Sequence, residues 1–267
     1  MIFIESGEGR FNSPAVTQYE KMLLTYAAAQ DMALDPDKPK SKNLLLRILG
    51  EMRSGMWLLL RNWRFYAGLA VLFAGMRLNF MSQTYLHDYI SNHEPLPVLS
   101  DLILDNIPKW DIGYVYDIAS LLSSVIFAIY VVHRRKYRQV PLFLLLCGVF
   151  HLIRGVFIVL TPFGHPEEFN GTPGPFNGFS EFELGVYPSG HTGISWMFFV
   201  LAADKRYRIA LMVCLVVIVS SLFLSRGHYS IDVLSGIFFA YAIKTYGQKY
   251  WRRIEIPNPD TELAGDA

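Results

Sequence analysis

Two short segments of the chain combine histidine with the residue types that phosphoryl-transfer chemistry uses. They are Pro188-Ser189-Gly190-His191-Thr192 and Gly227-His228-Tyr229-Ser230-Ile231-Asp232. His228 and Asp232 are four residues apart, so on a helix they share one face and the carboxylate can reach an imidazole nitrogen. Such a carboxylate fixes the tautomer and leaves the other nitrogen to attack. We therefore predict His228 as a nucleophile oriented by Asp232, with His191 as the general acid for the leaving group.

Further residues around these segments are candidates for binding a phosphate. Ser189 and Gly190 stand where a helix is expected to begin, and helix N-termini attract anions through unpaired N–H groups and partial positive charge. Arg154 lies in an apolar run, where a charge is costly, so it either contacts substrate or makes a structural ion pair or snorkels. Arg226 is predicted to pair with a non-bridging phosphoryl oxygen, the alternative being an exposed interfacial arginine. His151 is expected to be a buried, hydrogen-bonded histidine rather than a catalyst.

The composition places these residues in a membrane protein. Of 267 residues, 52% are hydrophobic and only 18% are charged, below the quarter or so that is usual in soluble domains. The net charge of +1 argues against nucleic-acid binding, which needs a strong basic excess. Cys147 and Cys214 both lie in apolar runs, which leaves no disulfide framework or cysteine-based zinc site. We expect no metal and no cofactor.

Six segments are apolar enough to suggest helical membrane spans, each of which needs roughly 20 residues. They are Trp63 to Ser82, Ile112 to Val132, Val140 to Leu160, His191 to Ala203, Ile209 to Leu224 and Ile231 to Tyr246. The fourth is short and is expected to continue into its flanking loops. The predicted fold is thus an all-α membrane protein with six transmembrane helices.

The distribution of basic residues predicts the orientation of these spans. Lysine and arginine precede the first span and follow the second, fourth and sixth, as Arg134, Arg135, Lys136 and Arg138 do after the second. Basic loops are typical of the cytoplasmic side. Both termini are therefore expected in the cytosol, with the two histidine segments on the non-cytoplasmic side.

The chain divides into three predicted parts. Residues 1–62 are expected to hold cytosolic or interfacial amphipathic helices, over Pro14 to Leu34 and Leu44 to Leu60. Residues 63–247 form the six-span catalytic domain, and residues 248–267 form a cytosolic tail that is expected to be disordered.

The two histidine segments resemble signatures of the phosphatidic-acid phosphatase type 2 superfamily, which read Pro-Ser-Gly-His and His-x-x-x-Asp. More specifically, the chain looks like the sphingomyelin synthase branch from Trp63 to Trp251, in order and with six spans. Further matches are Pro95-Leu96-Pro97 with Asp101 downstream, and Arg154 followed by Leu160-Thr161-Pro162. The resemblance implies His228 as nucleophile, Asp232 as its partner, and His191 as acid and then base in a two-step headgroup exchange.

Two departures from the family patterns bear on the substrate. Phosphomonoesterases of the superfamily carry an Arg-Pro signature, and this chain has no Arg-Pro dipeptide, which favours a monoanionic phosphodiester. The Cys-Gly-Asp usual in sphingomyelin synthases is replaced by Glu183-Leu184-Gly185. Glu183 or Glu181 is expected to offer a carboxylate to a choline or ethanolamine cation. Tyr229 is expected to offer it a cation–π face, the alternative being an interfacial aromatic belt.

The sequence therefore predicts a phosphotransferase related to sphingolipid metabolism. It would move phosphocholine or phosphoethanolamine from a glycerophospholipid to ceramide or diacylglycerol through a phosphohistidine. One alternative is a lipid phosphatase or phospholipase C-type hydrolase that uses the same His191, His228 and Asp232. Another is a non-catalytic lipid-binding protein. The expected partners are the donor and acceptor lipids, and a homo-oligomer is a further possibility.

Overall fold

The computed structural model describes residues 42–93, 96–166 and 187–257, and over these ranges all the regular secondary structure is helical, with seven α-helices and three 3₁₀ turns. The first helix, α2 (Lys42–Leu60), confirms the helix predicted for Leu44 to Leu60. The helix predicted for Pro14 to Leu34 lies outside the described residues. The other six helices belong to one compact unit, residues 52–267.

Each of the six predicted spans contains a helix. These are α3 (Trp63–Ser91), α4 (Gly113–His133), α5 (Val140–Leu160), α6 (Gly190–Leu201), α7 (Lys205–Leu224) and α8 (Ser230–Tyr250), with 3₁₀ turns at Leu104–Asn106, Lys136–Gln139 and Arg252–Ile254. α3 extends well beyond the predicted end at Ser82. α8 is followed by a turn and by buried Ile256, whose N–H donates to the Arg138 carbonyl at 2.9 Å. Residues 248–257 of the predicted tail thus comprise the end of α8, the 3₁₀ turn and the segment that contacts Arg138, while residues 258–267 lie outside the described residues.

Four of these helices are long and apolar enough to cross a membrane, namely α3, α4, α5 with its preceding turn, and α7. α6 has only 12 residues: Ser189 caps its start, and the helix ends at Leu201. The expectation that this segment continues into its flanking loops is therefore wrong. At 1.5 Å per residue α6 is about 18 Å long, less than a bilayer core of about 30 Å. Six spans thus remain a prediction.

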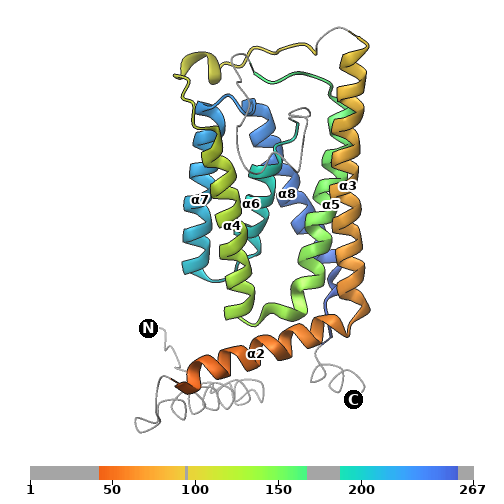
Figure 1. The fold of residues 1–267 in the computed structure, drawn as a ribbon, viewed down its shortest axis with the longest axis vertical. Coiled ribbons are helices and arrows are strands. Elements are labelled where there is room, and N and C mark those ends of the chain that lie inside the picture. The colour runs from red at the N-terminus through yellow and green to blue at the C-terminus, as the bar shows by residue number, and fades with distance from the viewer. Residues whose placement is uncertain (1–41, 94–95, 167–186, 258–267) are drawn as a thin grey trace, which may run out of the picture. The chain divides into compact units, whose positions relative to one another are not determined.

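Helices α3 and α5 lie side by side along their length (Figure 1), with their backbones in close approach. Glycines recur every seventh residue on both helices, at Gly68 and Gly75 and at Gly148 and Gly155. A Cβ on Gly75 would lie 2.5 Å from the Gly148 carbonyl oxygen. Only glycine allows this approach, so small residues bring the two helices together, as they do in membrane helix pairs generally.

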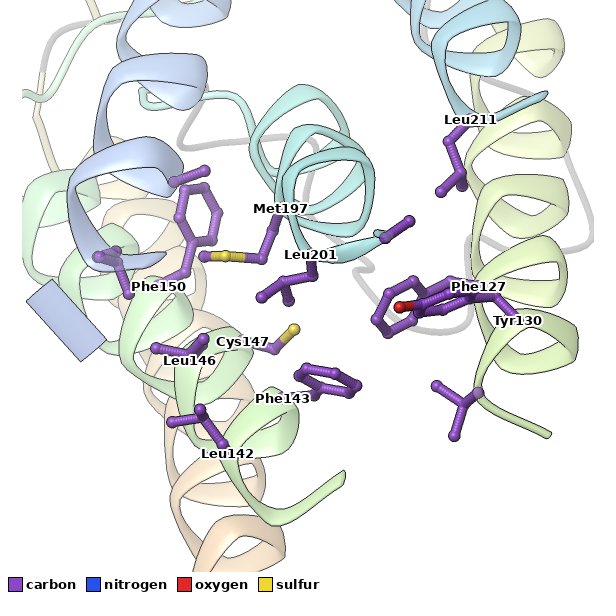
Figure 2. Close-up of a cluster of buried hydrophobic side chains, with 14 residues drawn as sticks. Phe127, Tyr130, Leu142, Phe143, Leu146, Cys147, Phe150, Met197, Leu201 and Leu211 are labelled. Carbon is purple, nitrogen blue, oxygen red and sulfur yellow. The ribbon is translucent and has the colours of Figure 1, made fainter. Parts of the chain in front are cut away.

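The remaining helices pack around a hydrophobic core. α4 packs on α7, and the short α6 contacts α4, α5, α7 and α8. Figure 2 shows this core, to which α4, α5, α6 and α7 all contribute. Its labelled members are Phe127, Tyr130, Leu142, Phe143, Leu146, Cys147, Phe150, Met197, Leu201 and Leu211. The core holds α6 in place although the helix is short.

The alternating direction of the helices brings the two histidine segments to one end of the bundle. α4, α6 and α8 begin at the end drawn uppermost in Figure 1, here called the upper end, and α3, α5 and α7 finish there. The basic segments that follow α4 and α8 and precede α7 all lie at the opposite, lower end. This arrangement agrees with the prediction that the basic segments share one side of the membrane. Which side that is remains a prediction.

Candidate functional site

The first turn of α8 carries one histidine–carboxylate pair. Asp232 Oδ2 accepts hydrogen bonds from the backbone N–H of Tyr229 at 2.9 Å and from His228 Nδ1 at 3.2 Å. The first of these bonds satisfies a free donor at the helix start. Because a carboxylate only accepts, the His228 proton sits on Nδ1 and its Nε2 carries the lone pair. The structure thus brings together the pair predicted from the four-residue spacing.

Burial favours the neutral form of the His228 imidazole. The His228 side chain is only 7% exposed and that of Asp232 is fully buried. This desolvation lowers the pKa of His228, and the nearby charges of His191 and Arg154 lower it further. The hydrogen bond and charge of Asp232 act in the opposite direction without cancelling the effect of burial. A neutral imidazole with a free Nε2 is the form required of a nucleophile.

A loop before α4 fixes the start of α8 from outside. Asp101 Oδ2 accepts from the Ser230 N–H at 2.6 Å, and Asp101 Oδ1 accepts from the Ile103 N–H at 2.9 Å. Burial raises the pKa of Asp101, but these N–H bonds outweigh it and the pKa is lowered overall. The buried Tyr229 hydroxyl accepts from the Leu99 N–H at 3.0 Å. Tyr229 therefore serves the fold at this point, rather than facing the cavity described below.

The predicted phosphate contact from Arg226 takes a different form in the structure. Its guanidinium donates to the Leu104 carbonyl at 2.5 Å and to the Ile107 carbonyl at 3.0 Å. The residue has a φ of 62°, in the left-handed region that is uncommon outside glycine. It lines a separate cavity of about 650 Å³ beside Asp101 and Asp105. The structure does not bring Arg226 to the two histidines.

The start of α6 is held against the start of α8. Ser189 caps α6, accepting from the Thr192 N–H, and its own N–H donates to the Asp232 carbonyl at 3.0 Å. A Cβ on Gly236 would lie 2.7 Å from the Ser189 carbonyl oxygen, so glycine allows the two helices to meet here. A Cβ on Gly190 would lie 3.2 Å from Arg154 Nε. Ser189 and Gly190 therefore stand at a helix start, as predicted, while their contact with phosphate remains a prediction.

His191 forms a second histidine–carboxylate pair. Its Nε2 lies 3.0 Å from Asp117 Oδ1 on α4, and the two side chains are 36% and 22% exposed. The ring centroids of His191 and His228 are 6.4 Å apart. Asp117 was missed in the sequence, although a lone carboxylate inside an apolar helix is a functional signal.

Arg154 connects the start of α6 to α3. Its Nε donates to the Pro188 carbonyl at 2.9 Å, and its Nη1 donates to Asn79 Oδ1 at 3.3 Å. Both bonds turn the guanidinium into the bundle, so snorkelling is not its role. Its charge is close enough to lower the pKa of His228. Of the three alternatives for Arg154, the structure therefore disfavours snorkelling, and it places the guanidinium beside the candidate site, where a contact with substrate remains a prediction.

A cavity of about 400 Å³ opens next to these groups, between α3, α4, α5 and α6. It is lined by Met76, Asn79, Phe80, Gln83, Ser120, Ser124, His151, Arg154, Gly190, His191, Ile194 and Ser195. His228 is not part of this lining, and its ring centroid lies 6.4 Å from that of His191. Glu183 lies outside the described residues. The site can therefore offer an anion the Arg154 cation, a helix start and two imidazoles of different exposure.

Comparison with known families gives one match, to the PAP2 superfamily C-terminal family, over residues 187–249. This stretch contains His191, His228 and Asp232, which the structure has placed together. Members of the PAP2 superfamily are phosphatases and phosphotransferases, so the match suggests a fold of that type. It does not distinguish the sphingomyelin synthase branch. No curated protein matches the chain.

Proposed function

We propose that this protein is a lipid headgroup phosphotransferase. It would take phosphocholine or phosphoethanolamine from a glycerophospholipid and pass it to ceramide or diacylglycerol. The observation that carries the proposal is the approach of two histidine–carboxylate pairs, with ring centroids 6.4 Å apart, where His191 of one pair lines a cavity that also contains Arg154. Two imidazoles at such a separation suit a nucleophile and an acid–base on opposite sides of one phosphorus atom.

In the first half-reaction His228 Nε2 attacks phosphorus and a P–N bond forms. The bond between phosphorus and the diacylglycerol oxygen breaks, and protonated His191 gives its proton to that oxygen. Asp232 holds Nδ1–H of His228 and stabilises the positive ring as the bond forms. Arg154 and the N–H groups at the start of α6 face the charge that develops on the phosphoryl oxygens.

In the second half-reaction the diacylglycerol leaves and a lipid alcohol takes its place. His191, now neutral, accepts the hydroxyl proton while the alcohol oxygen attacks phosphorus. The P–N bond breaks and returns the electron pair to His228 Nε2. Because His191 Nε2 is engaged with Asp117, its Nδ1 is the nitrogen that exchanges the proton.

Two features of the sequence support a phosphodiester donor and a non-cytoplasmic site. The Arg-Pro element typical of the superfamily's phosphomonoesterases does not occur in this chain. The basic loops predict a cytosolic lower end, so the histidines would act on the non-cytoplasmic side.

Product analysis in liposomes tests the proposal. The purified protein is reconstituted with phosphatidylcholine and phosphatidylethanolamine, and fluorescent ceramide or fluorescent diacylglycerol is added in separate samples. A new fluorescent lipid that bears a headgroup is the expected result, and its mass identifies donor and acceptor. His228→Ala reconstituted in parallel is the control, since it should insert normally and form no product.

The alternatives predict different products. Release of water-soluble phosphocholine, phosphoethanolamine or inorganic phosphate without a new lipid would make the protein a hydrolase and overturn the transferase proposal. Equal inactivity of the wild type and His228→Ala with every donor and acceptor would favour a non-catalytic lipid-binding protein.

A further inference from the structure

Next to the two histidine–carboxylate pairs, the cavity contains a third histidine that the mechanism above does not use. His151 lies on α5, one helical turn before Arg154, and lines the same cavity. The sequence favoured a satisfied buried histidine at this position. The structure shows a partner for one of its two ring nitrogens and leaves the other to be explained.

A chain of hydrogen bonds fixes the tautomer of His151. Arg154 can only donate, so the Asn79 atom that it contacts at 3.3 Å must be the amide oxygen. The amide nitrogen of Asn79 then points to His151 Nδ1, at 2.8 Å. An amide nitrogen also only donates, so His151 Nδ1 must accept. The proton of neutral His151 therefore resides on Nε2.

The Nε2–H of His151 is a donor without a protein acceptor. Over the ranges that the structure describes, no hydrogen bond joins this nitrogen to another residue, while the ring lines the cavity. His151 is half-buried, and a donor on a ring that lines a cavity is available to a ligand or water there. Asn79 is itself only 8% exposed, so the orientation of the ring is fixed by buried groups.

A second unsatisfied group lines the same cavity from the other side. The hydroxyl oxygen of Ser120, on α4, is buried and has no partner among the described residues. The cavity between α3 and α4, which do not pack tightly on each other, is thus lined both by polar groups and by apolar Met76, Phe80 and Ile194. This combination fits the part of a lipid where the headgroup meets the acyl chains.

We propose that His151 is a substrate-binding residue whose Nε2–H donates a hydrogen bond to an oxygen of the phospholipid donor. The acceptor is either a non-bridging phosphoryl oxygen or an ester carbonyl oxygen at the first carbons of the acyl chains. The inference rests on the proposed function, because it names a contact to the same substrate. Asn79 is then a positioning residue, which sets the tautomer of His151.

Two substitutions separate the cavity donor from the bond to Asn79. In His151→Asn the side-chain oxygen can still accept from Asn79, but no N–H reaches the position of Nε2. In His151→Gln an amide N–H reaches that position while the bond to Asn79 is lost. His133→Asn makes the same chemical change at the lower end of the bundle, where the histidine contacts Tyr207, and is the matched control.

The first readout is the KM for phosphatidylcholine in the liposome assay. His151→Asn is expected to raise KM about 3- to 10-fold, the effect of one lost hydrogen bond, with kcat less affected. His151→Gln should remain closer to the wild type, and His133→Asn should match it. A KM for His151→Asn equal to that of His133→Asn would overturn the proposal, as would an equal defect in folded His151→Gln and His151→Asn.

The second readout needs no turnover and identifies the oxygen. In a His228→Ala background, thermal stabilisation by added diacyl and dialkyl phosphatidylcholine is compared with and without His151→Asn. A loss of stabilisation with both lipids indicates the phosphoryl oxygen, and a loss with the diacyl lipid alone indicates the ester carbonyl. No loss with either lipid overturns the proposal. If the wild type forms no product but this binding difference persists, the proposed function fails while the His151 contact stands.

Discussion

The two histidine–carboxylate pairs of the site are built in opposite ways. His228 and Asp232 lie four residues apart in one helical turn and are almost completely buried. His191 and Asp117 come from α6 and α4, 74 residues apart in sequence, and both side chains are partly exposed. The pairs also use different nitrogens, Nδ1 in His228 and Nε2 in His191. A buried, locally fixed imidazole suits a nucleophile, and an accessible one suits proton exchange with two successive alcohols.

Of the substitutions that test this comparison, replacing the buried histidine should have the largest effect on turnover. His228→Ala removes the nucleophile, and we expect turnover to fall by roughly 10⁴-fold or more. The measurement is headgroup transfer in liposomes, with correct insertion checked by size exclusion and thermal unfolding. Transfer at the wild-type rate in a folded His228→Ala variant would exclude the phosphohistidine mechanism.

Removing the carboxylate of the exposed pair should have a smaller effect. Asp117→Asn leaves His191 in place but weakens its orientation and the stabilisation of its protonated form. We expect turnover to fall about 10- to 100-fold, part of the roughly 10²- to 10⁴-fold that general acid–base catalysis contributes. The matched variant is Asp232→Asn, which should lose more because its partner is the nucleophile. A larger loss in Asp117→Asn would reverse the roles that we assign to the pairs.

The pH dependence of the reaction should reflect the burial of His228. Its folded-state pKa is lowered, chiefly by desolvation, so the neutral nucleophile persists as the pH falls below the usual value of about 6.5. Activity that depends on neutral His228 should therefore be lost only as the pH falls through this lowered pKa. The acidic limb of kcat/KM measures it, and a midpoint above 6.5 would contradict the burial argument.

The smallest effect on turnover is expected from Asp101, which acts on the buried pair only through the start of α8. Asp101→Asn should destabilise the fold by about 1–2 kcal/mol, because one amide cannot replace all the N–H bonds that the carboxylate accepts. Its folded pKa is lowered, so the stabilisation is present above the unfolded pKa and disappears as the pH falls through the folded value. Thermal unfolding of the wild type and Asp101→Asn, near neutral pH and in acid, measures the lost stability and its pH dependence. A stability difference between the two proteins that grows in acid would refute the argument.

The sequence could predict contacts between residues that are close in the chain but not contacts between distant segments. The pairing of His228 with Asp232 is visible in the sequence because helical geometry alone brings them together. The pairing of His191 with Asp117 depends on how α4 packs beside α6, which no local pattern encodes. The contacts of Arg226 are hidden in the sequence for a related reason, since the carbonyls that bind it belong to a loop more than a hundred residues earlier.

The helices themselves were predicted better than their lengths. Apolar runs located all six, but the end of α3 near Ser91 carries polar residues that hydropathy places outside a span. The length of α6 was misjudged because membrane thickness was taken to set it, whereas the helix begins at the Ser189 cap and ends at Leu201.

The glycine-lined contact between α3 and α5 has a consequence for how variation in related sequences should be interpreted. Gly75 and Gly148 sit where any side chain would collide with backbone atoms, while Phe73, two residues away, is 70% exposed. Substitutions at the glycines would be rejected by steric exclusion, and those at Phe73 would be tolerated if they remain apolar. Invariant glycines in an alignment would then mark the line along which two backbones touch, and they should not be counted among the residues that carry out the reaction.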